Sequence, residues 1–269
     1  QCAYYHESGS DFEYVKTLIE RFPSGALGLV LDGFDLFKAT TEVLPQLRKQ
    51  IMSRVGGPLV IRPDSGDPVD IICGLFGAKE SFTGDEIRNP SYKGMVELLW
   101  DIFGGTTNKQ GYKVLHPSIR LIYGDAINLE RFKEINTRLE AKGFAYTNWV
   151  AGIGSFTYQF NTRDTFGFAM KSTYQEVVRY EGDGIQVSQG GTLDLVKKGV
   201  NIFKDPITDD GTKKSAKGLL KVEKNSDAID ECSFILKDQV SWQEENQGFL
   251  KVIFENGEFY NQISLSSIR

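Results

Sequence analysis

Polar or glycine-rich groups follow four short apolar runs of the sequence. The groups are DGFD at 32–35, RPDSG at 62–66, GD at 124–125 and GIGS at 152–155. An aspartate after a strand is most often a turn former or a helix cap, so a single group of this kind means little. Four in series are more informative, because the carboxyl ends of parallel strands form the binding face of α/β proteins. We therefore expect the four groups to converge.

Arg62 and Asp64 are separated only by Pro63, whose ring restricts the backbone of the turn. This spacing can hold a cation and an anion at a fixed separation. The pair can therefore bind a charged ligand or form a structural salt bridge, and the spacing favours neither.

Gly152, Gly154 and Ser155 stand shortly before Arg163. Backbone N–H groups beside a guanidinium suit a phosphate monoester. Because a GxGS pattern is weak evidence by itself, the phosphate site is a hypothesis.

The elements that must position these groups alternate between short apolar runs and amphipathic helices. We expect strands at 27–31, 58–61, 119–123 and 147–150, and helices at 11–22, 34–54, 94–103 and 129–142 with a further one starting at Pro68. Asp67 is the expected cap of the helix at Pro68. The uncharged run 27–31 indicates a strand covered on both faces. This succession predicts an α/β fold with parallel strands and right-handed crossovers.

After about residue 165 the pattern changes to short runs of Thr, Tyr, Val and Phe, which indicates a β-rich segment. A hairpin is expected at 249–260 with its turn at 255–257. We expect the lysine-rich stretch 197–224 to form a mobile loop and one strand.

Composition limits the class of protein. With 269 residues, 40% hydrophobic residues and a net charge of −5, the chain has enough apolar material for a core. The length suits one (β/α) barrel of roughly 250 residues or two smaller domains. The acidic balance argues against a DNA or RNA groove. No apolar run approaches the roughly 18 residues of a membrane span and the N-terminus does not resemble a signal peptide, so we expect a cytoplasmic protein.

Cysteine and histidine are scarce. Cys2, Cys73 and Cys232 lie far apart, which argues against a disulfide scaffold or a zinc knuckle and favours buried thiols. The two histidines, His6 and His116, exclude HExxH and histidine-rich metal cages. Any metal is therefore expected on oxygen ligands.

Taken together, the motifs resemble those of the nicotinamide phosphoribosyltransferases. PLVIRPDSGDP at 58–68, DGFD at 32–35, YGD at 123–125, NTRD at 161–164 and NIFKDP at 201–206 occur in the order of that family, at similar intervals, over nearly the whole chain. The nicotinate phosphoribosyltransferases share the architecture, but the RPDSG and KDP segments are more similar to those of the nicotinamide enzymes.

The resemblance implies transfer of a phosphoribosyl group from phosphoribosyl pyrophosphate to the ring nitrogen of nicotinamide, with Mg²⁺, giving nicotinamide mononucleotide and pyrophosphate. It also implies a homodimer that binds neither nucleic acid nor membrane. The implied domains are an incomplete barrel-like phosphoribosyltransferase domain at 1–165 and a β-rich segment at 166–269, which belongs to a second domain completed by N-terminal residues absent from this chain.

Site residues carry over motif by motif. Arg62 and Asp64 are the expected catalytic residues: Arg62 lies against nicotinamide or pyrophosphate, and Asp64 binds the ribose hydroxyls. The other expected substrate-binding residues are Pro63, Gly124 and Asp125, the last two on the ribose side, and Gly154, Ser155 and Arg163 at the 5′-phosphate. Residues of second rank, near the pyrophosphate or the metal, are Asp32, Asp35, Lys171 and Lys204. The resemblance does not specify metal ligands.

The chain departs from the family pattern at two places. Ser155 stands where the family usually has a glycine. The family's catalytic histidine belongs to a Glu-His-Ser motif before the first helix, whereas His6 is followed by Glu-Ser-Gly-Ser. We expect that motif slightly upstream of Gln1, His6 to be an exposed terminal residue, and the chain to be a C-terminal part of the enzyme with low activity by itself.

Three alternatives stay open. The base can be nicotinate, because the residues that choose between the two bases in the family lie outside this chain. The chain can be a non-catalytic module that binds a phosphosugar, or a different phosphosugar enzyme built on a (β/α) barrel.

Overall fold

The computed structural model describes residues 8–75, 88–154, 170–181, 194–208, 214–226 and 233–268, together with residues 159, 161 and 165. The chain forms two compact units, Gln1–Lys171 with Lys204–Lys214, and Ser172–Phe203 with Ser215–Arg269. The segment 204–214 thus returns to the first unit. The division of domains at residue 165 stays a prediction.

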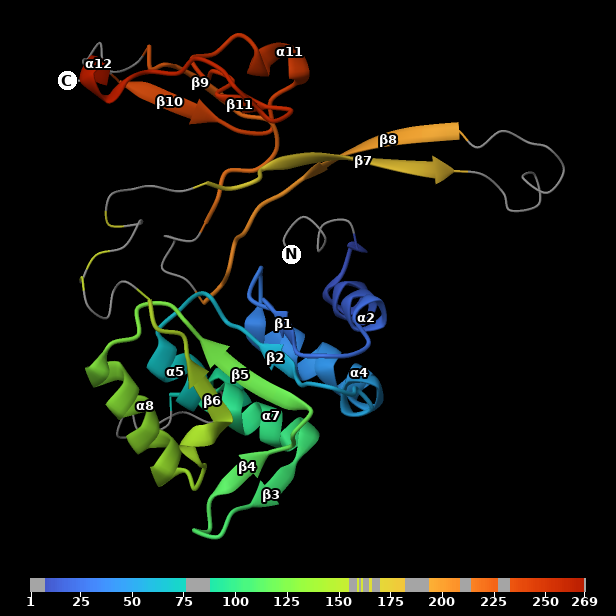
Figure 1. Ribbon diagram of the computed structural model, residues 1–269, viewed down its shortest axis with the longest axis vertical. Helices are drawn as coiled ribbons and strands as arrows, with labels where there is room; N and C mark the ends of the chain where they lie inside the picture. The colour runs from blue at the N-terminus through green and yellow to red at the C-terminus, as the bar shows by residue number, and fades with distance from the viewer. Residues whose placement is uncertain are drawn as a thin grey trace, which may run out of the picture. The chain divides into compact units, whose positions relative to one another are not determined.

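A parallel four-stranded sheet forms the centre of the first unit (Figure 1). Its order is β1 (Leu27–Leu29), β2 (Leu59–Ile61), β5 (Ile119–Tyr123) and β6 (Trp149–Ala151). The register pairs Leu29 with Ile61, Ile61 with Leu121, and Tyr123 with Ala151. These are the strands that the sequence predicted, and a mixed α/β fold with parallel strands is confirmed.

The helices of the first unit lie close to their predicted ranges. They are α2 (Asp11–Arg21), α3 (Leu36–Lys38), α4 (Leu44–Met52), α5 (Pro68–Cys73), α7 (Met95–Phe103) and α8 (Leu129–Ala141), with short 3₁₀ turns at Pro90–Tyr92 and Tyr146–Asn148. The Asp67 side chain accepts a hydrogen bond from the backbone N–H of Val69 at 2.8 Å, which confirms the predicted cap of α5.

The expected helix 34–54 is not uniform, because a π-helical turn, Ala39–Val43, lies between α3 and α4. The hydroxyl groups of Thr40 and Thr41 donate to the carbonyls of Leu36 and Phe37, each at 2.8 Å. Such hydroxyl bonds to the preceding turn compete with regular helical geometry.

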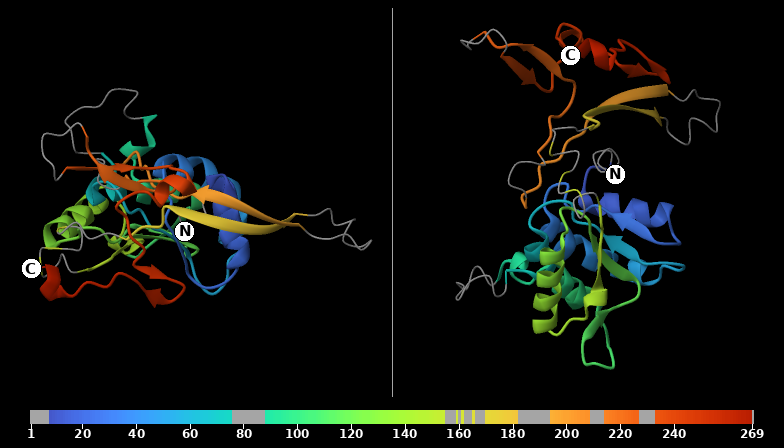
Figure 2. Two further views of the ribbon diagram at one scale, coloured as in Figure 1. Left: turned by 90° about the horizontal axis from the view of Figure 1, so that it is seen from above. Right: turned by 60° about the vertical axis from the view of Figure 1, so that its left-hand side comes forward.

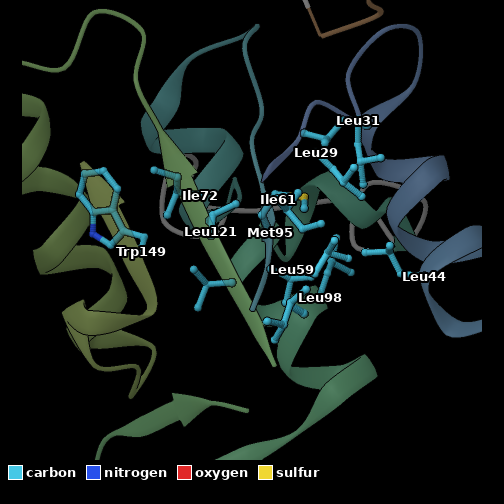
Figure 3. Close-up of a cluster of buried hydrophobic side chains, with 14 of the residues drawn as sticks. Leu29, Leu31, Leu44, Leu59, Ile61, Ile72, Met95, Leu98, Leu121 and Trp149 are labelled. Carbon is cyan, nitrogen blue, oxygen red and sulfur yellow. The ribbon is translucent and has the colours of Figure 1, made fainter. Parts of the chain in front are cut away.

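Apolar side chains from the sheet and the helices form one core (Figure 3). Leu59, Ile61 and Leu121 from the strands are completely buried, as are Ile72 of α5 and Met95 of α7. Full burial of such a side chain stabilises the fold by about 1.5–3 kcal/mol. The core therefore fixes the strands whose ends carry the polar groups.

Cys73 is a free, buried thiol, as predicted. Burial raises the pKa of this thiol to about 12, so the sulfur stays protonated and its role is in packing. Cys2 and Cys232 lie outside the described residues.

The opposite face of the sheet is less covered. Gly28 is exposed, Val60 and Ile122 are half-buried, and Val150 is 50% exposed, whereas their neighbours along the strands are more deeply buried. Since successive side chains of a strand point to opposite faces, only one face carries the core within the described ranges. The prediction that the strand at 27–31 is covered on both faces is therefore wrong for the described part of this chain.

A hairpin that the sequence did not predict follows α7. Its strands are β3 (Gly105–Thr107) and β4 (Lys113–Leu115), which are antiparallel. The Asn108 side chain accepts hydrogen bonds from the N–H groups of Gln110 and Tyr112 and so stabilises the turn. The strands are short and carry few apolar residues, which explains why the pattern was missed.

The second unit is β-rich, as expected. A long ribbon joins β7 (Tyr174–Glu181) to β8 (Asp194–Asn201) (Figure 2). The other elements are the pairs β9 (Lys221–Lys224) with β10 (Phe234–Lys237) and β11 (Phe254–Glu255) with β12 (Glu258–Phe259), and the short helices α11 (Trp242–Glu245) and α12 (Leu265–Ile268). Asn256 and Gly257 have positive φ angles of 52° and 89°, so the predicted hairpin turn is confirmed. The stretch 197–224 contains two strands rather than one, namely the C-terminal part of β8 and all of β9.

Among the helices of the described ranges, none combines the length and the apolar character that a membrane crossing requires.

Gly124 and Gly152 touch where β5 and β6 end. A Cβ atom on Gly152 would lie 2.6 Å from Gly124 Cα and 3.3 Å from the Tyr123 carbonyl oxygen. We predict that Gly152→Ala lowers the free energy of unfolding by about 1–3 kcal/mol, because the backbones must separate. Gly28→Ala is the matched control, since no described residue beyond its two chain neighbours lies within 4 Å of its Cβ position. Urea unfolding followed by tryptophan fluorescence compares the two, and equal stabilities would contradict the prediction.

Candidate functional site

The four polar groups follow strands that run in the same direction, and hydrogen bonds or close contacts link them. The Asp64 N–H donates to Asp32 Oδ2 at 2.6 Å, which joins the loops after β1 and β2. The Tyr123 hydroxyl, at the end of β5, lies 2.7 Å from the carbonyl oxygen of Gly66. The contact of Gly124 with Gly152 joins the ends of β5 and β6. One edge of the sheet therefore carries all four groups.

Asp32 holds the RPDSG loop in place through hydrogen bonds to its carboxylate. Its side chain is completely buried, and Oδ2 accepts hydrogen bonds from the Asp64 N–H and, at 2.7 Å, from Ser65 Oγ. The other oxygen, Oδ1, is buried without a hydrogen-bond partner among the described residues. A carboxylate placed in this way holds a loop in shape, because its accepting oxygen replaces the water that the loop groups lose.

Asp35 caps a helix. Its side chain caps helix α3 by accepting from the Lys38 N–H at 2.9 Å. This is the helix-cap function that an aspartate after a strand most often has. The place of Asp32 and Asp35 near a pyrophosphate or a metal stays a prediction.

Asp64 lies between two cations. Arg62 Nη2 is 3.4 Å from Asp64 Oδ1, and Lys204 Nζ is 3.2 Å from Asp64 Oδ2. The side chains of Arg62, Asp64 and Lys204 are 51%, 31% and 21% exposed. Ion pairs with this much exposure add little to stability. The salt bridge exists, but its three groups remain open to solvent and to a charged ligand.

Lys204 reaches this place because its segment folds back onto the sheet edge. The N–H of Asp205 donates to the Gly33 carbonyl at 3.2 Å, and the N–H of Ile207 donates to the Phe34 carbonyl at 3.0 Å. Both acceptors belong to the loop after β1. The KDP motif is thus part of the same site as DGFD and RPDSG, although it lies far away in sequence.

Two hydroxyl-bearing residues that sequence reasoning did not assign to the site complete this junction. Ser65 Oγ lies 2.7 Å from Thr208 Oγ1. Gly66 has a φ of +82°, and a Cβ atom there would lie 2.9 Å from the Thr208 carbonyl oxygen, so a larger residue would push the segment away. Ser65 had a signal, since it belongs to RPDSG, whereas nothing in the sequence marked Thr208.

Tyr123 supports the RPDSG loop from the side of β5. Its ring is buried, and its hydroxyl lies 3.0 Å and 2.7 Å from the carbonyl oxygens of Ser65 and Gly66. Burial raises the pKa of this hydroxyl, and nearby carboxylates, Asp125 first among them, raise the pKa further. The phenol therefore stays protonated and remains a donor.

Arg131 of α8 joins the loop after β5 to the start of α5. Its Nη1 donates to the Ala126 carbonyl at 2.8 Å, and its Nη2 lies 3.8 Å from Asp67 Oδ2. Ala126 has a positive φ of 50°, which a non-glycine residue adopts only when its surroundings hold it there. The loop that carries Gly124 and Asp125 is therefore held in place.

The remaining predicted residues differ in how much the structure says of them. Pro63 is buried, Asp125 is half-buried, and Gly124, Gly154 and Lys171 are exposed. Ser155, Arg163 and His6 lie outside the described residues. The predicted 5′-phosphate site is thus described only as far as Gly154.

The described ranges contain no group of three or more His, Cys, Asp or Glu side chains that could hold a metal ion. Mg²⁺ usually binds through one or two carboxylates and the phosphates of a substrate, and keeps several waters. The residues present therefore fit a Mg²⁺ ion that arrives with a diphosphate, with the partly exposed Asp64 able to offer an oxygen.

Two cations beside a partly exposed carboxylate, at the carboxyl ends of parallel strands, define an α/β protein with a site suited to a phosphorylated ligand. Comparison with known families agrees with this class. Residues 4–257 match the model of the nicotinate phosphoribosyltransferase (NAPRTase) family, and the chain belongs to that family.

Individual relatives carry the name nicotinamide phosphoribosyltransferase. The protein of that name from Acinetobacter baylyi is 45% identical over 97% of this chain and 47% of its own length. One from Xanthomonas campestris is 31% identical over 92% of this chain and 44% of its own length. One from Mycoplasma pneumoniae is 38% identical over 59% of this chain and 33% of its own length. The chain therefore spans about half the length of the curated relatives that it matches, or less.

The hydrogen bonds of Asp32 yield a prediction about stability. Asp32→Ala leaves the Asp64 N–H without its acceptor and removes the charged acceptor of the buried Ser65 hydroxyl, so we expect the free energy of unfolding to fall by about 2–4 kcal/mol. Asp35→Ala is the control, because it removes one helix cap and should cost about 1 kcal/mol. Chemical denaturation measures both variants, and an Asp32→Ala protein as stable as the control would contradict the assigned role.

Proposed function

We propose that the protein to which this chain belongs is a nicotinamide phosphoribosyltransferase, which makes nicotinamide mononucleotide and pyrophosphate from nicotinamide and phosphoribosyl pyrophosphate. The observation that carries the proposal is Asp64 between Arg62 and Lys204 at the strand ends. The relative from Acinetobacter baylyi, which bears that name and matches 97% of the chain, supports the choice of substrates.

The proposed reaction transfers the ribosyl carbon C1 from an oxygen of pyrophosphate to the ring nitrogen of the base. The C1–O bond breaks and its electron pair leaves with pyrophosphate, while the C1–N bond forms with the lone pair of the ring nitrogen. Positive charge develops on the ribose and negative charge on the leaving group. Fixed charges of opposite sign near these atoms lower the barrier, because they are already oriented before the reaction begins.

The residues of the site can provide those charges. Asp64 binds the ribose hydroxyls and places its carboxylate near the developing positive charge. Lys204, and Arg62 where it does not lie against the base, neutralise the departing pyrophosphate. In the absence of substrate these cations pair with Asp64, and the phosphates of the substrate compete for them when it binds. This exchange of partners costs little free energy, because the three side chains are partly hydrated.

The other predicted residues surround the same substrate. Gly124 and Asp125 line its ribose, where the absence of a side chain on Gly124 leaves room. Gly154, Ser155 and Arg163 hold the 5′-phosphate through backbone N–H groups and a guanidinium. When bound, Mg²⁺ would supply positive charge to the pyrophosphate, and the partly exposed Asp64 would contribute an oxygen.

We further propose that the complete enzyme is a cytoplasmic homodimer whose first unit is part of a (β/α) barrel. The half-covered sheet face, with Val60, Ile122 and Val150, supports the barrel, since further strands would bury that face. The family resemblance supports the dimer. Nicotinate is the second candidate for the base, because the matching family model is named for the nicotinate enzymes.

Activity of the full gene product tests the proposal. We expect nicotinamide mononucleotide to form from nicotinamide, and Arg62→Ala and Asp64→Ala to lower kcat/KM at least about 100-fold, because each removes a charge that acts in the transition state. Product is quantified by chromatography with nicotinamide and with nicotinate as the base.

The controls are Lys93→Ala and Asp101→Ala, which break an exposed ion pair of 2.6 Å that includes none of the site residues. Both should keep at least half of the wild-type kcat/KM. Full activity in both Arg62→Ala and Asp64→Ala would refute the assignment of the site. Product from nicotinate alone would replace nicotinamide by the second candidate.

A further inference from the structure

The hydroxyl of Ser65 stands between a carboxylate and a second hydroxyl. Ser65 Oγ is 2.7 Å from Asp32 Oδ2 and 2.7 Å from Thr208 Oγ1. A carboxylate accepts hydrogen bonds, and a serine hydroxyl carries one proton, so Ser65 donates to Asp32. Its lone pair then accepts from Thr208. The chain of bonds therefore has one direction, from Thr208 through Ser65 to Asp32.

This chain lies where water competes little for it. Asp32 is completely buried, Ser65 is 2% exposed, and Thr208 is half-buried. Hydrogen bonds in such surroundings are stronger than at the surface, and those that end on a carboxylate are stronger than those between neutral groups. Thr208 is thus tied to the buried carboxylate that also holds the Asp64 N–H.

The bond of Thr208 closes one end of the segment that carries Lys204. At the other end, Lys204 pairs with Asp64, and between them the N–H groups of Asp205 and Ile207 bond to the loop after β1. Of these attachments, the Lys204 pair is the one that substrate phosphates would break. When Lys204 turns to a phosphate, the position of its backbone depends on other attachments of the segment, among them these two backbone bonds and the side-chain bond of Thr208.

We propose that Thr208 is a positioning residue, which latches the segment 204–208 onto the RPDSG loop so that Lys204 keeps its place while it exchanges Asp64 for the pyrophosphate group. The identity of this ligand rests on the proposed function. The latch itself is a property of the fold and acts without substrate. In this proposal Thr208 acts through Lys204 and not on the substrate itself.

The latch predicts a specific kinetic change in the full gene product. Thr208→Val keeps the shape of the side chain but removes the donor. We expect KM for phosphoribosyl pyrophosphate to rise about three- to tenfold, the effect of losing one hydrogen bond, with KM for nicotinamide within twofold of wild type. Thr208→Ser keeps a hydroxyl at this position and should restore KM for phosphoribosyl pyrophosphate to within twofold.

Hydrogen–deuterium exchange without ligand tests the latch independently of catalysis. Peptides that cover 204–208 should exchange at least threefold faster in Thr208→Val than in wild type, and at the wild-type rate in Thr208→Ser. Thr41→Val is the matched control: Thr41 is also half-buried, and its hydroxyl bonds to the Phe37 carbonyl in its own helix. This control should leave both the exchange of 204–208 and KM for phosphoribosyl pyrophosphate unchanged.

The outcomes separate the latch from the proposed function. Unchanged exchange of 204–208 in Thr208→Val overturns the latch, whatever the activity. Faster exchange with unchanged KM for phosphoribosyl pyrophosphate overturns its role in positioning Lys204. Faster exchange in a protein whose wild type forms no nicotinamide mononucleotide upholds the latch and refutes the proposed function.

Discussion

The site depends on one buried carboxylate. Asp32 accepts hydrogen bonds from the Asp64 N–H and the Ser65 hydroxyl, and so fixes the loop after β2 to the end of β1. Three other residues of the site bond to this loop: Tyr123 donates to its carbonyls, Lys204 pairs with its aspartate, and Thr208 bonds to its serine. A buried donor that loses its acceptor costs free energy, so the hydrogen bonds of the Asp64 N–H and the Ser65 hydroxyl to Asp32 Oδ2 favour this one shape of the loop.

The two aspartates of the site, Asp32 and Asp64, differ in burial and in the groups that they contact. Asp32 is completely buried, and one of its oxygens accepts the hydrogen bonds that fix the loop. Asp64 is 31% exposed and pairs with two cations. The rigid group can therefore stay in place while the exposed group changes partners. Such a division allows a site to be preorganised and still to accept a ligand that carries several negative charges.

Much of the fold could be predicted from sequence, because it follows from local patterns. The four strands, the helix at 11–21 and the cap at Asp67 follow from apolar runs, helical spacing and an Asp-Pro pair. The hairpin at 105–115 escaped prediction because its strands have only a weak apolar pattern. The sequence also did not predict how each face of the sheet is covered. The apolar composition of a strand does not show whether this chain contains the elements that pack on both of its faces.

The candidate site was predictable where motifs mark it and not where contacts are distant. Arg62, Asp64 and Lys204 stand in motifs, whereas Thr208 becomes visible only when its segment returns to the RPDSG loop.

The same return has a consequence for folding. Lys204 and Asp64 are 140 residues apart, so their contact closes a long loop of chain. Contacts of this kind form after the local ones, because the entropy of the loop must first be overcome. During synthesis, the residues of the four strands leave the ribosome before Lys204 does. We therefore expect the pairing of Lys204 with Asp64 to form after the strands of the sheet.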